Sequence, residues 1–321
     1  MSALSIREAE WHAQRAKGIG ASDVPAIAGV SSYAQPIDVW QQKVGLVEPN
    51  PETPLTRWGN LLEPVIAEEA ERVIGIKFRR LARAVHYRDW PVLFAHLDRT
   101  SADAILECKS SMTTKGWGDD GSSTVPDAVA LQVQSQLACA DKELAYVAAL
   151  IGYRDFRTYR IERDRPFFDD LILPILREFW TLVETNTPPE PDGSDGYGSF
   201  VRRRFPTDAG DERAATPEEH LIGAALVAAT GERERAEAHE AELKQRLMLA
   251  MGTTGKLDGP GWRATWRQSK DRVTTDWKLA GGAFRRVAAN LMSDDELDAI
   301  ESIYTDTKPG TRPFLFKPEG D

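Results

Sequence analysis

Two short apolar runs in the first half of the chain, Val92–Ala95 and Ala104–Cys108, constrain the fold more than any other stretch. Each run has the length and composition of a buried strand, and a polar turn from Arg99 to Asp103 separates them. One carboxylate, Asp98, follows the first run, and a second, Glu107, lies near the end of the next. We therefore expect neighbouring strands that bring the two acids together.

A lysine completes this group of charged side chains. Lys109 lies two residues after Glu107, so on a strand both project from one face while Cys108 points away. Mg²⁺ prefers oxygen ligands and usually takes only one or two carboxylates while keeping several waters. A lysine beside the ion could orient or deprotonate a water, as metal-assisted phosphodiester hydrolysis requires. The structural alternative is a plain cross-strand salt bridge.

The chain contains a second Glu-x-Lys triplet, Glu242-Leu243-Lys244. This copy lies in a Glu-, Ala- and Arg-rich run that is typical of a helix. Residues two apart on a helix do not face each other, so we do not expect this copy to converge on a metal.

Composition indicates a globular protein with room for one large and one smaller domain in 321 residues. We expect no membrane span, because no apolar run approaches about 20 residues. Two cysteines are too few for a disulfide framework, so a reducing cytoplasm is expected. The net charge of −10 argues mildly against bulk nucleic-acid binding. However, an enzyme that encloses DNA needs only local basic clusters, such as Lys77–Arg80 with Arg83, and Arg202–Arg204.

A glycine-containing turn, residues 18–23, follows a helix expected over residues 5–17 and leads into an apolar helix over Val24–Val30. Ser22 or Asp23 is expected to cap that helix. A helix N-terminus is also an anion site, and Arg15 is close in sequence. Simple capping with a surface arginine is the alternative reading.

The remaining pattern alternates helices and strands. Helices are expected over residues 36–45, 57–75, 126–143 and 166–186, and a hairpin over residues 144–164. Pro64 is expected to bend or break the second of these helices, beside Glu63. Gln132 and Gln136 share one face of the third, at i and i+4.

A Pro- and Gly-rich stretch, residues 187–196, indicates a boundary or surface loop, and a second unit begins near Thr216. We expect a long helix to Gly252, interrupted near Gly231. Behind it, tryptophan and arginine alternate over residues 262–267, as in a strand buried on one face. Such residues can bind single strands when exposed, but we expect the tryptophans to form a small hydrophobic core.

The order of these motifs resembles the phage lambda-type alkaline exonucleases, also called the YqaJ viral recombinase family, of the PD-(D/E)xK nuclease superfamily. The likeness covers about residues 8–186. It lies in GIGASD, in RWGNLLEP, in HLD followed by ILECK, in the loop before LQVQSQL, and in RIERD. It implies an α/β fold with a restriction-endonuclease-like core, in which helices flank a mixed central sheet. This core would occupy residues 1–205, with a smaller α/β extension of unknown role over residues 206–321.

The resemblance also implies a set of metal ligands. Asp98 and Glu107 would hold Mg²⁺, or Mn²⁺ as a substitute, together with the backbone carbonyl of Cys108. Glu63 would lie beside the metals, as a candidate ligand of a second ion.

Four further residues take implied roles. Lys109 would position or activate the attacking water, and Gln132 would orient the nucleophile or Lys109. Arg15 and Ser22 match the family's pocket for a 5′ phosphate.

The implied activity is 5′-to-3′ digestion of one strand of linear double-stranded DNA, for phage-type recombination in a bacterial or phage-infected cytoplasm. A ring-shaped homotrimer and a single-strand annealing partner are implied as well. The family usually has glycine where this chain has Arg99, which changes the turn, contacts DNA phosphate or impairs the centre. The alternatives are therefore an endonuclease or repair nuclease, or a DNA-end-binding scaffold without activity.

Overall fold

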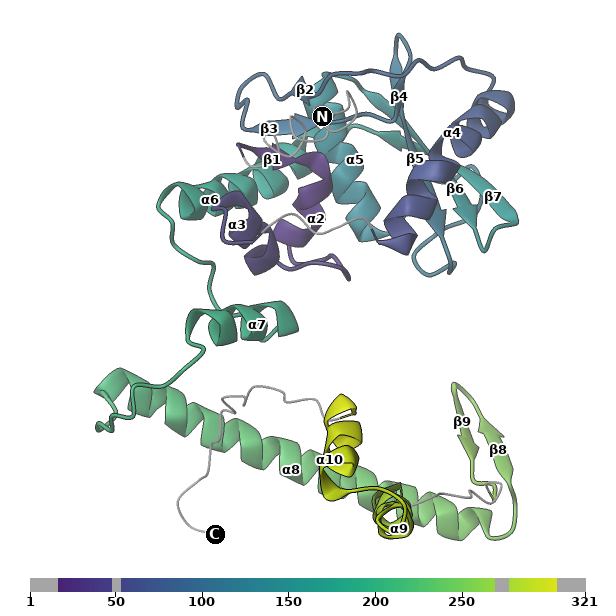
Figure 1. The fold of residues 1–321 in the computed structure, drawn as a ribbon. Coiled ribbons are helices and arrows are strands. Elements are labelled where there is room, and N and C mark those ends of the chain that lie inside the picture. Colours follow the sequence, from purple (N-terminus) through teal and green to yellow (C-terminus); the bar gives the residue numbers. More distant parts are fainter. Residues whose placement is uncertain (1–16, 48–52, 269–276, 305–321) are drawn as a thin grey trace. The chain divides into compact units, whose positions relative to one another are not determined.

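The computed structural model describes residues 17–47, 53–268 and 277–304 (Figure 1). The chain divides into two compact units, residues 1–205 and 206–321. The helix expected over residues 5–17 lies outside the described residues except for its last position.

The main sheet of the first unit has four strands in the order β4-β5-β6-β7. Their bounds are Arg99–Thr100, Ala104–Ser111, Leu144–Ile151 and Asp155–Glu162. β5 and β6 are parallel and the other two pairs are antiparallel, so the sheet is mixed, as expected. The β6–β7 hairpin confirms the one expected over residues 144–164. β6 is almost entirely apolar because helices cover both faces of the sheet at this point.

A smaller sheet has the order β1-β3-β2, with bounds Ile19–Gly20, Leu93–Ala95 and Val85–His86. The predicted pairing of the run at 92–95 with the run at 104–108 is therefore wrong. β5 pairs instead with β4, which lies inside the stretch predicted as a turn. The actual turn is shorter, because Ser101 closes it by donating N–H to the carbonyl of Ala104 (2.8 Å) and accepting from its N–H through Oγ (3.0 Å).

Two helices cover opposite faces of the main sheet (Figure 1). On one face α4 (Pro54–Ile74) packs Ile66, Ala67 and Ala70 against alternate residues of β5 and β6. On the other face α5 (Asp127–Ala140) packs its apolar side chains against Ile105 and the remaining β6 positions. The result is a three-layer arrangement with β5 in the middle.

α4 begins three residues before the prediction and is continuous through Pro64. The hydroxyl of Thr53 caps the helix by accepting from Thr56 N–H (3.2 Å). A proline removes one backbone hydrogen bond. Packing of the following turns on the sheet holds the helix together, so of the two predicted effects of Pro64 the break is wrong and the bend stays a prediction.

The other helices of this unit are short. The 3₁₀ turn η1 (Ala21–Asp23) leads directly into α2 (Val24–Ile27), and the next helix along the chain is α3 (Pro36–Lys43). The helix expected over residues 166–186 begins with a π-helical segment, η2 (Phe167–Ile172), and continues as α6 (Leu173–Glu184). α7 (Asp195–Arg204) was not predicted. It is capped by Ser194 and packs Phe200 edge-on against Trp40 of α3, with ring centroids 5.8 Å apart.

The second unit contains α8 (Pro217–Met251), a hairpin of β8 (Lys256–Gly259) and β9 (Trp262–Thr265), α9 (Trp277–Ala288) and α10 (Asp294–Ile303). α8 is uninterrupted, so the predicted break near Gly231 is wrong. A single glycine costs a helix only about 1 kcal/mol, too little to divide so long an element. The predicted tryptophan core is also wrong, because Trp262 and Trp266 are half exposed.

No helix in the described part of the chain combines the length and the apolar character needed to cross a bilayer.

Candidate active site

Asp98 and Glu107 meet through the pairing of β4 with β5. In this register Arg99 lies opposite Leu106 and Thr100 opposite Ile105, so Asp98 comes next to Glu107. The carboxylate of Asp98 accepts a hydrogen bond from the backbone N–H of Cys108 (2.8 Å to Oδ2). The two acids thus converge as expected, although the strand that pairs with β5 is β4 and not the predicted run at 92–95.

Glu107 is the centre of a buried hydrogen-bond network. Its side chain is 4% exposed, and its Oε1 atom lies 2.7 Å from the Lys109 ammonium. Gln132 Nε2 donates to the same oxygen (2.7 Å), and Gln136 Nε2 donates to Oε2 (2.6 Å). Lys109 in turn donates to Gln132 Oε1 (2.9 Å). Three donors therefore fix both carboxylate oxygens.

Strand and helix periods explain why these four side chains meet. Glu107 and Lys109 are two apart on β5 and face α5, whereas Gln132 and Gln136 are one turn apart on α5 and face β5. Gln136 was not predicted to be a site residue. Its position on the Gln132 face was the available signal, and its near-complete burial could not be read from sequence.

The concentration of acids changes the protonation of Asp98. Burial raises the pKa of Asp98 well above its usual value, and the charges of Glu107 and Glu63 raise it further. The Cys108 N–H and the Lys109 charge act in the opposite direction. Asp98 therefore lies where negative charge is in excess.

Lys109 remains an ammonium ion in this environment. Burial alone would lower the pKa of Lys109, but the charge and hydrogen bond of Glu107, with Asp98 nearby, hold the pKa above its usual value. In this state Lys109 has no free electron pair with which to accept a proton.

Glu63 lies at the edge of the same group and is paired with Arg99. Arg99 Nη1 donates to Glu63 Oε1 (2.6 Å) and to the backbone carbonyl of Asp98 (2.6 Å). Both side chains are largely buried, 13% exposed for Arg99 and 25% for Glu63. Arg99 therefore neutralises Glu63 and braces the backbone at Asp98.

The glycine-containing turn differs from the prediction. α2 has only four residues, and Asp23 does not cap it through its side chain. Instead the buried Asp23 carboxylate accepts from Gly20 N–H (3.1 Å) and from the Lys43 ammonium (2.7 Å). Ser22 is exposed at this turn, and Arg15 lies outside the described residues. The 5′-phosphate pocket stays a prediction.

The carboxylate oxygens of Asp98 and Glu107 are ligands of the kind that a hard cation such as Mg²⁺ prefers. Within residues 17–47, 53–268 and 277–304, no three or more His, Cys, Asp and Glu side chains form a metal cluster. The metal ligands expected from the sequence are only two carboxylates, of Asp98 and Glu107, and the backbone carbonyl of Cys108. Asp98 accepts its one hydrogen bond from the described residues through Oδ2. The Oε1 atom of Gln136 is buried and has no hydrogen-bond partner in that same part of the chain.

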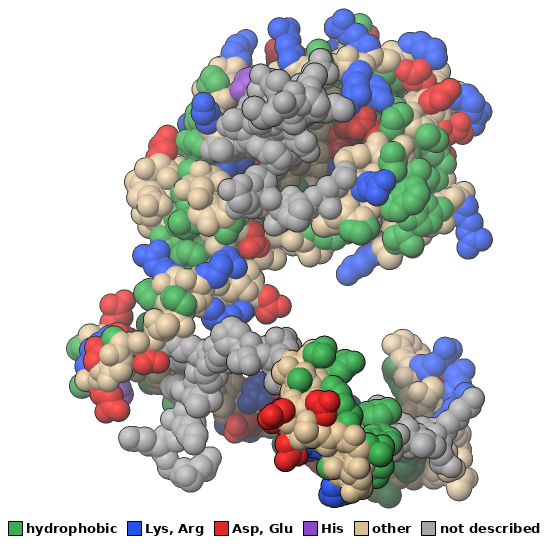
Figure 2. All heavy atoms as spheres, in the orientation of Figure 1, with side chains coloured by type: hydrophobic (Ala, Val, Ile, Leu, Met, Phe, Trp, Pro, Cys, Tyr) green, Lys and Arg blue, Asp and Glu red, His purple; other side chains and the backbone are tan. Residues whose placement is uncertain are grey.

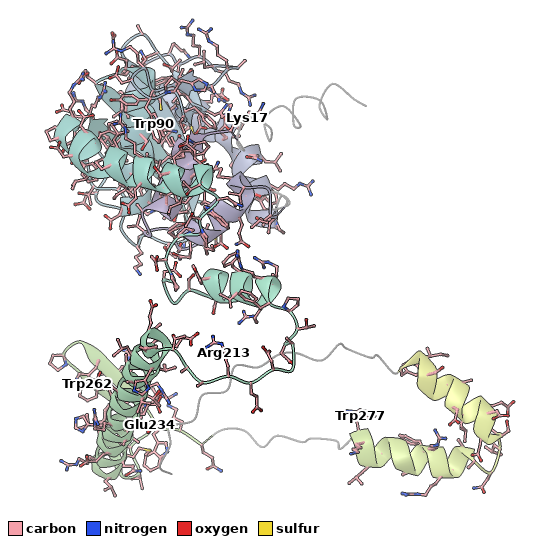
Figure 3. The ribbon with its side chains drawn as sticks, turned by 90° about the vertical axis from the view of Figure 1, so that its left-hand side faces the viewer. Lys17, Trp90, Arg213, Glu234, Trp262 and Trp277 are labelled. Carbon is pink, nitrogen blue, oxygen red and sulfur yellow. The ribbon has the colours of Figure 1, made fainter. Side chains whose placement is uncertain are left out.

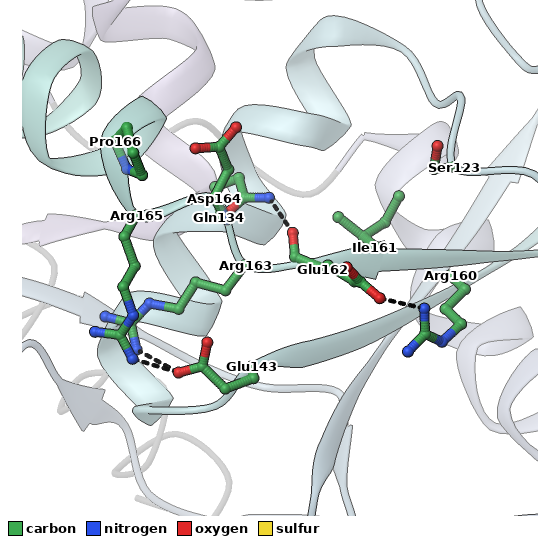
Figure 4. A pocket seen from close by; sticks show the side chains of 10 residues that line it. All are labelled: Ser123, Gln134, Glu143, Arg160, Ile161, Glu162, Arg163, Asp164, Arg165 and Pro166. Atoms are coloured by element: carbon green, nitrogen blue, oxygen red, sulfur yellow. Dashed lines mark hydrogen bonds and ion pairs between the residues drawn. The ribbon is translucent and has the colours of Figure 1, made fainter.

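A separate hollow of about 710 Å³ lies beside the end of β7 (Figure 4). It contains several charged side chains, but most of them pair with one another. Arg160 binds Glu162 (2.5 Å), and both Arg163 (3.7 Å) and Arg165 pair with Glu143. Because these charges are paired, few of them are available to bind a charged ligand. The group around Asp98 and Glu107 is therefore the better candidate for the active site.

Part of the first unit is similar to known sequences. Residues 10–143 match the model of the YqaJ-like viral recombinase domain. Among curated proteins, the chain is similar to the uncharacterized protein YqaJ of Bacillus subtilis strain 168. The two are 33% identical over 204 residues, which are 61% of this chain and 63% of that relative. The chain thus spans less than two thirds of the relative's length.

Solved structures give weaker likenesses. LHK-Exo, an alkaline exonuclease from Laribacter hongkongensis solved in complex with dAMP, has a TM-score of 0.44 at 15% identity. The match covers 61% of this chain and 96% of that one. A phage-related exonuclease from Haemophilus somnus 129PT has a TM-score of 0.37 at 10% identity, covering 59% and 96%. Because both TM-scores are below 0.5, these structures carry no argument, and the likeness that counts is the one in sequence. Over residues 10–143 the chain is therefore similar in sequence to the YqaJ-like viral recombinase domain.

Proposed function

We propose that the first unit is a Mg²⁺-dependent exonuclease that digests one strand of linear duplex DNA from 5′ to 3′, for recombination by single-strand annealing. The observation that carries this proposal is the convergence of Asp98, Glu107 and Lys109 with Gln132 inside a YqaJ-like recombinase domain. A ring-shaped homotrimer and an annealing partner belong to the same proposal. Sedimentation of the full chain tests the trimer.

Asp98, Glu107 and the Cys108 carbonyl would hold the ion. When bound, Mg²⁺ supplies charge stabilisation at the phosphoryl oxygens and lowers the pKa of a bound water. Gln132 and Gln136 hold the Glu107 oxygens in fixed directions, and Gln132 also holds the Lys109 ammonium. Lys109 then acts as a fixed positive charge that positions the attacking water and the phosphate.

Arginines beside β4 support a DNA substrate. Arg79 forms a backbone pair with Thr100, through hydrogen bonds of 2.8 and 2.9 Å, so its segment runs alongside the strand that follows Asp98. Arg79, Arg80 and Arg83 are exposed, and none of them has an ion-pair partner in the described ranges. Figure 2 shows basic side chains along the margin of the unit near β2 and β4. Unpaired guanidinium groups of this kind bind phosphates.

The test is nucleotide release from linear duplex DNA with Mg²⁺, comparing wild type with Lys109→Ala and Glu107→Gln. We expect each variant to be slower by about 10²–10⁴-fold. Lys244→Ala, in the helical Glu-x-Lys triplet, is the matched control and should keep wild-type activity. If wild type and the site variants release equally little, the enzyme proposal fails and a DNA-end-binding scaffold becomes the better account.

Two substrates refine the assignment. Cleavage of closed-circular duplex at the rate of linear duplex would favour an endonuclease. Arg15→Ala should reduce the preference for 5′-phosphorylated ends, and an unchanged preference would count against a phosphate pocket at that residue.

A further inference from the structure

The β8–β9 hairpin of the second unit exposes two tryptophans. Trp262 and Trp266 are 50% and 51% exposed (Figure 3 marks Trp262). Trp266 continues the ladder beyond β9, because its N–H donates to the carbonyl of Gly255 (3.1 Å). Residues 262, 264 and 266 therefore share one face of the ribbon. Large aromatic side chains at half exposure on a shared face indicate a binding surface.

The hairpin fixes Trp262 in place. Pro260 and Gly261 form the loop, and Gly261 has φ +76°, which a Pro-Gly turn of type II requires. Gly259 lies opposite Trp262 in the ladder. A Cβ atom at Gly259 would come within 2.3 Å of the Trp262 ring, so the indole lies directly across the glycine backbone. The ring is therefore held in a defined orientation.

The opposite face of the same hairpin carries positive charge, because Lys256 pairs across the ladder with Thr265 and Asp258 with Arg263. Residues 256–267 contain Lys256, Arg263 and Arg267 against the single acid Asp258. Asp258 is shared by Lys256 (2.8 Å) and Arg263 (2.5 Å), whereas Arg267 has no ion pair with any residue that the structure describes. The hairpin therefore keeps an excess of positive charge in a chain whose net charge is −10.

We propose that this hairpin binds single-stranded DNA. Unpaired bases stack on Trp262 and Trp266, and phosphates contact Arg267 and the basic groups around Asp258. No further strand of the described residues pairs with either edge of this two-stranded ribbon. A long guanidinium side chain on one face can therefore extend past an edge toward a ligand on the other. In duplex DNA the base faces are covered by their neighbours, which favours the single strand.

This inference deepens the proposed function and, for its biological role, rests on it. Digestion of one strand of a duplex leaves the other unpaired, and the hairpin would hold that strand. The hairpin lies outside residues 10–143, the range matched by the recombinase family.

The experiment measures binding of fluorescein-labelled oligo(dT) to the full chain by anisotropy, in EDTA so that nothing is cleaved. The double variant Trp262→Ala/Trp266→Ala should raise Kd by about 10-fold or more, because stacking contributes strongly for each base. The variant Trp262→Phe/Trp266→Phe should recover most of the affinity. Trp277→Ala, on α9, removes a tryptophan that is 75% exposed and should leave Kd unchanged. Arg267→Ala should reduce the slope of log Kd against log salt by about 0.7.

Three results would overturn the inference: no binding of oligo(dT) by wild type, unchanged Kd in the double alanine variant, or equally weak binding by the phenylalanine variant. The same proteins are then assayed on linear duplex DNA with Mg²⁺. Hydrolysis by wild type together with unchanged oligo(dT) binding in the alanine variant would overturn the hairpin inference alone. Lost oligo(dT) binding in that variant, with no hydrolysis by wild type, would overturn the nuclease proposal alone.

Discussion

Glu107-Cys108-Lys109 and Glu242-Leu243-Lys244 have the same spacing of acid and amine but lie on different elements. On β5 the acid and the amine bind each other at 2.7 Å. On α8 they point apart, and Glu242 binds Arg246 (2.5 Å) while Lys244 binds Glu240 (2.5 Å). The strand triplet is largely buried, whereas the helical side chains are more than half exposed.

The difference shows that a charged triplet is only as informative as the element and the neighbours around it. A strand directs both groups to one point, and the glutamines of α5 complete their hydrogen bonds there. On a solvated helix the same residues make i,i+4 pairs that contribute about 0.3–0.5 kcal/mol each. Three experiments compare charged groups at the buried site with exposed charged groups on α8.

The largest effect is expected from removing the two glutamates. Glu107→Ala leaves Lys109, Gln132 and Gln136 without their shared acceptor, and should lower the free energy of unfolding by about 3–5 kcal/mol. Glu242→Ala should change it by no more than about 0.5 kcal/mol. Urea denaturation of both variants in EDTA measures this. Equal losses would mean that burial of the strand triplet is energetically unimportant.

A smaller effect, of opposite sign, is expected at Asp98. Because its folded-state pKa is raised, the protonated form favours folding, and this contribution is lost as pH rises through the folded pKa. Asp98→Asn keeps the acceptor for Cys108 N–H without the charge. In EDTA the variant should therefore be more stable than wild type at pH 8. The advantage should disappear below the usual aspartate pKa of about 3.9. A variant less stable than wild type at pH 8 would contradict this electrostatic picture.

The smallest effect is expected at the start of α8. Hydrogen bonds from Arg213 and from Thr216 lower the pKa of Glu219 from 4.5 to about 2. The stabilisation is present above pH 4.5 and is lost as pH falls through about 2, since a depressed pKa favours the ionised form. Glu219→Gln should remove this pH dependence and affect only the first turn. Amide hydrogen exchange at residues 218–220 measures it, and exchange that changes throughout α8 would argue against a local cap.

The sequence predicted the members of the candidate site better than the way they are brought together. Asp98, Glu107, Lys109 and Gln132 meet as expected, because the periods of strand and helix are local properties. The partner of β5 was predicted wrongly, since pairing depends on distant packing and not on local pattern. The same limit applies to Arg99, whose contact with Glu63 joins residues far apart in the sequence.

Errors in the second unit have a related cause. Alternation over residues 262–267 correctly predicted a strand but not what would cover it. Among the described residues, the tryptophans that read as a core are half exposed. Burial is a property of neighbours, so periodicity alone could not supply it.

Helix α5 is held by glutamines on opposite sides. Gln132 and Gln136 face Glu107, while Gln134 donates to the Glu162 carbonyl (2.8 Å) and accepts from Asp164 N–H (2.9 Å). Rotating or sliding the helix by a single residue would break both sets of bonds at once. The position of α5 relative to the sheet is therefore fixed at two places, at Glu107 on β5 and at the end of β7. This double attachment limits how far the side chains around Glu107 can move.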